Sequence, residues 1–149
     1  MKRFLQNSCI FLFIISIISM LLELGISSRL QNDTYSRLYS GWNYIYDDTT
    51  YHDVIINGSS RAWVQYNPCI LDTILNTNSY NLGTENGMIN RQILRYKKYC
   101  QFHKVPSLLI QNIDYFTMTS VSGYEVEQYY PYFYDRDFLN ELNKYEIFS

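Results

Sequence analysis

The chain is poor in the residues that most often catalyse reactions or hold metals. Its 149 residues include three cysteines and only two histidines, His52 and His103, which lie far apart. Zinc sites usually take Cys and His ligands at short spacings, so we expect no metal site and no cofactor. A Cys100–His103 pair would lack the third member that a cysteine hydrolase needs. The sequence also has no glycine-rich phosphate loop and no Gly-x-Ser-x-Gly elbow. It therefore carries no catalytic signature.

Charge is also scarce, and its balance excludes a second class of function. Only 17% of residues are charged, and the net charge is −2. A chain of this charge has no electrostatic attraction for nucleic acid. Aromatic residues, sixteen tyrosines among them, make up another 17%. This composition predicts a folded domain, and the length suffices for one domain with its own core.

The N-terminus carries the most specific signal. Lys2 and Arg3 precede an apolar run over 10–22, and small residues follow at 25–28. This order is typical of a secretory signal peptide covering residues 1–27. The alternative is an uncleaved signal anchor, because residues 4–26 are about long enough to span a bilayer. Both alternatives place the rest of the chain in the secretory pathway, either secreted or as a single-pass protein with its C-terminal ectodomain outside.

Two further patterns agree with export. Asn32-Asp33-Thr34 and Asn57-Gly58-Ser59 are acceptor sequences for N-glycosylation. Cys69 and Cys100 form an even pair outside the leader, and an oxidising compartment would let them form a disulfide. Two buried free thiols are the alternative. We therefore expect a glycoprotein modified at Asn32 and Asn57, with a Cys69–Cys100 disulfide.

The order of secondary structure predicts one globular ectodomain over 51–149. Residues 28–50 fit a polar, Tyr-rich stalk or a short helix equally well. The elements expected after them are strands at 51–57 and 62–66, a helix from Pro68, a loop at 76–87, a helix at 89–100, strands at 105–113 and 115–122, and a last helix from 135. The fold class is therefore α/β, with α+β as an alternative.

The helix at 89–100 has two contrasting faces. Its apolar face is predicted from the spacing of four residues, which are Ile89, Ile93, Tyr96 and Cys100. Its basic residues are Arg91, Arg95, Lys97 and Lys98. Charged faces of helices are usually solvated, and the alternative is a site for an anion or an acidic partner.

An aromatic cluster follows at 129–134, immediately before the last helix. Tyr side chains bury a large area and keep a polar tip, so this cluster fits a protein-recognition surface. The alternative is that it packs onto the helix that begins near Asp135, whose apolar face includes Phe138 and Leu142.

The segment Val105-Pro106-Ser107, which enters the apolar run 108–110, gives the chain a resemblance to the thioredoxin-like superfamily. The resemblance extends back to the Pro68-Cys69 step. It implies a small mixed sheet flanked by helices, with a strand inside 79–84. It also implies a cis Val105–Pro106 bond beside Cys69. Tyr66 stands where that family has its nucleophilic cysteine, so the resemblance implies a one-cysteine or redox-inactive member.

Two functions are therefore expected from the sequence. The first is a secreted or membrane-anchored glycoprotein that binds another protein, for example in a viral envelope or at a host surface. The second is a thioredoxin-like thiol protein of the secretory pathway without a Cys-x-x-Cys motif, acting through Cys69 with Pro106 beside it. The first expectation involves no enzymatic activity.

Overall fold

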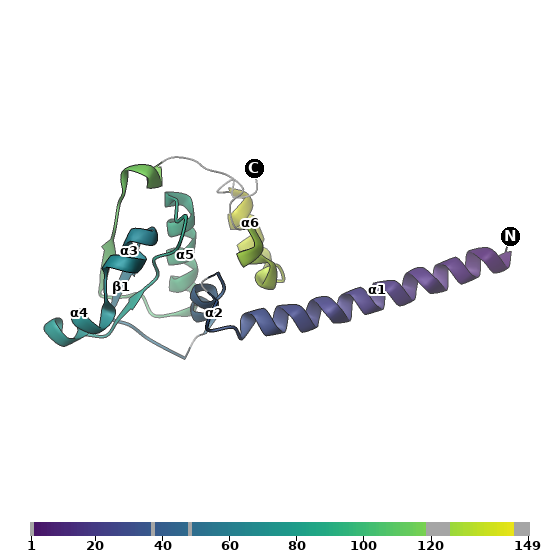
Figure 1. Cartoon of the computed structure of the whole chain (residues 1–149), viewed down its shortest axis with the longest axis horizontal. Coiled ribbons are helices and arrows are strands. Elements are labelled where there is room, and N and C mark those ends of the chain that lie inside the picture. Colours follow the sequence, from purple (N-terminus) through teal and green to yellow (C-terminus); the bar gives the residue numbers. More distant parts are fainter. Residues whose placement is uncertain (1, 37, 48, 119–125, 145–149) are drawn as a thin grey trace.

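The chain forms a small α/β domain that follows a long N-terminal helix. The computed structural model describes residues 2–36, 38–47, 49–118 and 126–144. Helix α1 (Lys2–Gln31) projects away from the domain as one rod and contains no buried residue (Figure 1). By length and composition it can cross a membrane, and a signal sequence at the N-terminus has the same properties. The predicted apolar N-terminal helix is confirmed.

A three-stranded sheet lies at the centre of the domain. The strands are β1 (Val54–Asn57), β2 (Ser79–Asn81) and β3 (Leu108–Gln111), in the spatial order β2-β1-β3. Both neighbours run parallel to β1, and Val54 is in register with Ser79 and Leu108. All four residues of β1 are buried, as expected for a β-branched strand at the centre of a parallel sheet. The α/β class is thus confirmed, and the described strands are all parallel.

The described residues form seven further helical segments around this sheet. They are α2 (Ser40–Tyr46), α3 (Ser60–Gln65), α4 (Pro68–Leu75), α5 (Ile89–Phe102), η1 (Tyr115–Met118), η2 (Val126–Tyr132) and α6 (Arg136–Lys144). Helix α4 begins as predicted, because Asn67 Oδ1 accepts a 3.0 Å hydrogen bond from the Cys69 N–H and Pro68 occupies the first turn. Helix α6 is capped in the same way by Asp135, whose Oδ1 accepts from the Phe138 N–H at 2.9 Å.

Two predicted strands are wrong in the described residues. The segment 62–66 lies mostly in α3, because the Ser59 side chain accepts from the Arg61 N–H and starts a helix directly after β1. Residues 115–118 form the 3-10 helix η1, and residues 119–122 of that predicted strand lie outside the described residues. Conversely, β2 lies inside the predicted loop 76–87. Pairing with β1 outweighs the poor strand propensity of Ser79 and Asn81.

An aromatic core lies where α2, α5, η2 and α6 meet. The Trp42 ring lies 5.0 Å from that of Phe138 and 5.6 Å from that of Tyr129, centroid to centroid. Tyr129 and Tyr132 are buried, so these two tyrosines of the aromatic cluster pack onto α6. Because α2 contributes Trp42 and Ile45 to this core, residues 40–46 are a short helix of the domain rather than part of a stalk.

The predicted apolar face of α5 is confirmed at Tyr96 and Cys100, which pack against the core, and is wrong at Ile93. Its fully buried apolar residues are Leu94 and Tyr99, whereas Ile93 is at the surface. Three of its basic residues are also buried, namely Arg91, Arg95 and Lys98. The predicted solvated basic face is therefore wrong at these positions, and aromatic rings cover Arg95 and Lys98.

Candidate ligand site at the carboxyl edge of the sheet

The chain places one strand on each side of β1. From β1 it continues to β2 on one side, and from β2 it crosses over to β3 on the other. The loops that follow the neighbouring strands β1 and β3 both leave the carboxyl edge of the sheet. In open parallel sheets, ligands bind in the crevice outside the carboxyl ends of the strands. The residues at issue are 58–61 after β1 and 112–117 after β3.

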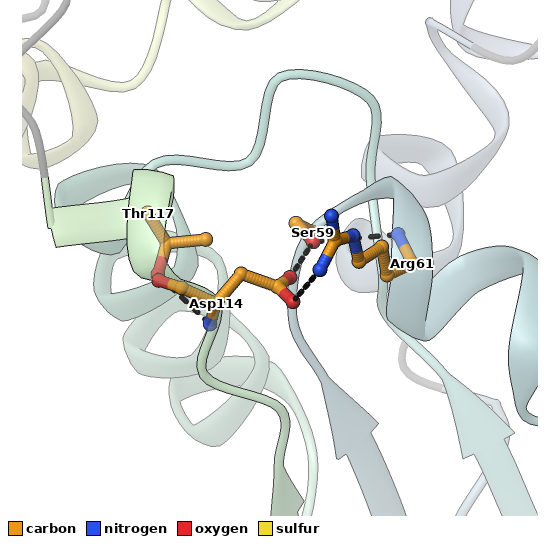
Figure 2. Close-up of polar contacts among 4 residues, drawn as sticks. All are labelled: Ser59, Arg61, Asp114 and Thr117. Atoms are coloured by element: carbon orange, nitrogen blue, oxygen red, sulfur yellow. Dashed lines mark hydrogen bonds and ion pairs between the residues drawn. The ribbon is translucent and has the colours of Figure 1, made fainter.

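A buried carboxylate joins these two loops. Figure 2 shows Asp114 pointing from the β3 side toward Ser59 and Arg61, which open α3. The Ser59 hydroxyl donates a short hydrogen bond to Asp114 Oδ2, and Arg61 Nη1 lies 3.1 Å from Oδ1. On its own loop, Asp114 is held by Thr117, whose hydroxyl donates to the Asp114 carbonyl at 2.7 Å. We refer to these four residues as the Asp114 clasp.

The clasp positions the groups around it. Both carboxylate oxygens of Asp114 already have partners, so Asp114 fixes the loops. Arg61 is half exposed, with 52% of its side chain accessible, and its guanidinium lies 4.5 Å from the centre of the Phe116 ring. Ser60 is half-buried, and its hydroxyl has no hydrogen-bond partner in the described part of the chain. The groups at this edge that can face a ligand are therefore the Ser60 hydroxyl and the outer N–H groups of Arg61.

A network of amides lies beneath the clasp. Asn57 Nδ2 donates to Gln111 Oε1 at 3.0 Å and to the Gln92 carbonyl at 3.1 Å. Asn57 is only 2% exposed. A glycan would need this nitrogen free and at the surface, so the predicted glycosylation of Asn57 is incompatible with the fold. Asn32, in contrast, is exposed next to the end of α1, where its Nδ2 donates a surface hydrogen bond of 2.7 Å to the Ser28 carbonyl.

A cavity of about 170 Å³ opens beside the carboxyl end of β2, and we call it the Arg95 pocket. Its lining includes Arg95 of α5, Gly41 of α2 and Trp63 of α3, together with Gly83 and Thr84 after β2. The Arg95 guanidinium carbon lies 5.1 Å from the centre of the Trp42 ring. Burial lowers the pKa of the Arg95 guanidinium. No hydrogen bond or ion pair joins Arg95 to any described residue, and its Nε is fully buried.

A larger pocket of about 630 Å³ adjoins it, and we call it the tyrosine pocket. The two pockets share Ser40 and Tyr80 in their linings. The tyrosine pocket is lined mainly by phenol and amide side chains, which are those of Tyr44, Tyr46, Tyr80, Tyr132, Tyr134, Asn32, Asn43 and Gln31. Together they form a polar, ring-bearing surface next to the end of α1.

The predicted disulfide is absent, and the cysteines lie in different surroundings. Cys69 is exposed in the first turn of α4, whereas Cys100 packs against the aromatic core. Burial raises the pKa of the Cys100 thiol. The Val105–Pro106 bond is trans, because the described chain contains no cis peptide bond, so the predicted cis bond is wrong. Trans is the more stable state for most X–Pro bonds. The structure does not test the thioredoxin-like relationship, which stays a prediction.

Both imidazoles lie at the other edge of the sheet, before the strands begin. His103 hydrogen-bonds through Nδ1 to the Thr50 carbonyl at 2.8 Å and through Nε2 to the Ile45 carbonyl at 3.0 Å. His52 makes a short hydrogen bond with the Tyr44 hydroxyl. The described residues also contain no cluster of three His, Cys, Asp or Glu side chains that could hold a metal. These histidines therefore have structural roles.

Sequence reasoning missed the Asp114 clasp and understated Arg95. A usable signal for the clasp was the polar residues that directly follow two apolar runs, Ser59 after β1 and Asp114 after β3. That signal needs the knowledge that both strands are parallel neighbours. No family model matches the chain, and neither the curated proteins nor the solved structures include a significant match.

Proposed function

We propose that the chain is an exported or membrane-anchored α/β domain that binds a small polar ligand at the carboxyl edge of its parallel sheet. The observation that carries this proposal is the buried Asp114 carboxylate, which holds Ser59 and Arg61 where the loops after β1 and β3 meet. Apolar helix α1, which fits a signal sequence or an anchor, supports the export part of the proposal.

Loops from all three strands converge at this edge. The Thr84 N–H, after β2, donates to the Gly58 carbonyl at 3.2 Å, and the Asn112 N–H, after β3, donates to the Asn57 carbonyl at 2.8 Å. Gly58 packs closely on Asn112, because a Cβ there would come within 2.8 Å of Asn112 Cβ. Such convergence brings polar side chains from distant parts of the sequence together at the edge of the sheet where ligand sites of parallel sheets form.

The chemistry of this edge supports binding more than hydrolysis. A serine hydroxyl becomes a nucleophile only with an adjacent base. Both described histidines lie at the opposite edge, and Asp114 contacts Ser59 instead of Ser60. Ser60 and Arg61 therefore act as hydrogen-bonding groups in this proposal.

A fragment screen by nuclear magnetic resonance tests the proposal. The isotope-labelled full chain in detergent micelles is titrated with a library of small polar fragments. We expect amide shifts to concentrate at 58–61, 83–84 and 112–117. Asp114→Asn removes the negative charge that holds Arg61 and should weaken the hits. The matched control is Asp137→Asn, because Asp137 is exposed on α6. Hits spread evenly over the surface, or equal in both variants, contradict the proposal.

A second candidate function, protein binding, is favoured by the exposed apolar side of α4. No residue of α4 is buried, and the fractional exposures of Ile70 and Ile74 are 57% and 72%. Val64 of α3 is exposed to a similar extent. Contiguous exposed apolar side chains often mark interaction sites. A photo-crosslinking amino acid at position 74 should give a discrete crosslinked product in expressing cells. The same probe at position 144 of α6 is the control, and equal patterns would exclude this candidate.

A further inference from the structure

We infer that the Arg95 pocket binds an oxyanion, the phosphate or carboxylate group of the ligand, with the Arg95 guanidinium as its counter-charge. The inference rests on the proposed function, because the pocket belongs to the same carboxyl edge. It goes further by naming the chemical class of the ligand.

The first argument is charge. Arg95 is 3% exposed, and an ionised group that leaves water is normally paired with an opposite charge. Lys98, on the same helix, follows that rule, since its Nζ lies 2.7 Å from Asp135 Oδ2. The Arg95 guanidinium lies over the face of Trp42, and no described carboxylate forms an ion pair with it. An oxyanion would supply the missing partner.

The second argument is space. The terminal nitrogen Nη2 of Arg95 lies directly against Gly41, where any Cβ would overlap it. Gly83 also lines the pocket, and a Cβ at this position would overlap the backbone of Trp63. The cavity of about 170 Å³ equals the volume of several waters, at roughly 30 Å³ each. That volume admits a phosphate or a carboxylate group but excludes a large ligand.

The third argument concerns the rest of the ligand. The tyrosine pocket shares Ser40 and Tyr80 with the Arg95 pocket. A ligand whose oxyanion meets Arg95 can therefore place a larger polar body among the phenol and amide groups of the tyrosine pocket. Guanidinium groups suit this role, because their planar N–H pattern matches the two oxygens of a carboxylate or phosphate.

Glu85 brings a negative charge to the pocket, opposite in sign to that of Arg95. It lines the same cavity and is exposed to solvent. Its carboxylate repels an approaching anion, so Glu85→Gln should tighten anion binding by about two- to fivefold. Because this residue is at the surface, the variant tests the pocket with little risk to folding.

The experiment measures binding of phosphate and of acetate to the full chain in detergent, with sodium chloride at the same ionic strength as reference. We expect at least one oxyanion to raise the melting temperature and to shift the amides of Gly41 and Gly83. Arg95→Met should weaken that binding by roughly tenfold or more, since a charge-assisted hydrogen bond is lost. If Arg95→Met does not fold, the Glu85→Gln titration decides. Preference for phosphate or for acetate identifies the ligand group.

The outcomes separate this inference from the proposed function. Oxyanion binding that Arg95→Met abolishes supports the inference. Fragment hits at the carboxyl edge combined with no response to either oxyanion overturn the inference and leave the proposed function standing. Oxyanion binding that is unchanged in both Arg95→Met and Glu85→Gln also overturns it. Absence of any binding at this edge overturns both.

Discussion

Arg95 and Lys98 show how two basic residues on one helix come to be buried by different means. Lys98 is satisfied by Asp135, which also accepts a 2.9 Å hydrogen bond from the Tyr46 hydroxyl. Arg95 is covered by an aromatic ring and opens into a cavity. At the residue scale, the first is a structural ion pair and the second is a group that can serve a ligand.

Replacing Lys98 by Met should destabilise the domain strongly. The change leaves the Asp135 carboxylate without its cation, and breaking a buried ion pair costs about 3–5 kcal/mol. The matched control is Lys97→Met, because the Lys97 side chain is 47% exposed and its 3.7 Å pair with Glu141 is at the surface. A surface pair contributes about 0–1 kcal/mol. Denaturant unfolding of both variants measures the difference, and equal losses would contradict the assignment of Lys98.

Asp135 should also make the domain sensitive to acid. Burial acts to raise the pKa of this carboxyl, but hydrogen bonds from Lys98, the Phe138 N–H and Tyr46 outweigh it, so the pKa lies below its ordinary value. The stabilisation is fully present above about pH 3.9, the ordinary pKa of an Asp carboxyl in the unfolded chain. It is lost as the pH falls through the lower pKa that Asp135 has in the folded domain. Unfolding measured between pH 6 and 2 should show this loss. In Asp135→Asn, the part of the acid dependence due to this group should disappear.

At the scale of elements, local signals predicted some helices and missed others. The starts of α4 and α6 were predictable, because each cap, at Asn67-Pro68 and at Asp135, involves only residues that are close in sequence. The buried face of α5 was only partly predictable, because Leu94 and Tyr99, which lie outside the predicted apolar stripe, also pack in the aromatic core. The strand β2 likewise depends on a partner that is remote in sequence.

The contrast between α4 and α5 leads to a paired substitution. Leu94→Ala should cost about 2–5 kcal/mol, because the side chain is fully buried and a cavity would be left. Ile74→Ala should change stability by less than about 0.5 kcal/mol, because Ile74 is largely exposed. Denaturant unfolding of the purified chain measures both. A large loss in Ile74→Ala would mean that α4 is covered in solution, for example by a second copy.

The candidate site could be predicted only in part from the sequence. Arg95 could be weighed as an anion-binding residue because it is basic, yet nothing local distinguishes it from Lys97. Asp114 and Ser59 are separated by more than fifty residues and meet only because β1 and β3 are parallel neighbours. Long-range pairing of this kind leaves no periodic pattern to read.

At the scale of the whole molecule, export and glycosylation can be tested together. In eukaryotic cells, we expect Asn32 to be the modified acceptor and Asn57 to carry no glycan, because its amide is buried in the network with Gln92 and Gln111. Enzymatic deglycosylation followed by mass spectrometry of the peptides measures both. Asn57→Gln should leave the glycan mass unchanged, whereas Asn32→Gln should remove it. A glycan on Asn57 in the folded protein would contradict the described burial.

The parallel sheet has a consequence for the order in which the chain can fold. Val54 pairs with Leu108, so the central strand gains its second neighbour only after 54 further residues have been made. No hairpin exists among the described strands to fold early, and pairing of remote segments is slow because a long loop must close. A chain that is threaded through a membrane from its N-terminus therefore arrives with its sheet unformed. For a chain exported as proposed above, this delay would keep the polypeptide unfolded while it passes through a narrow channel.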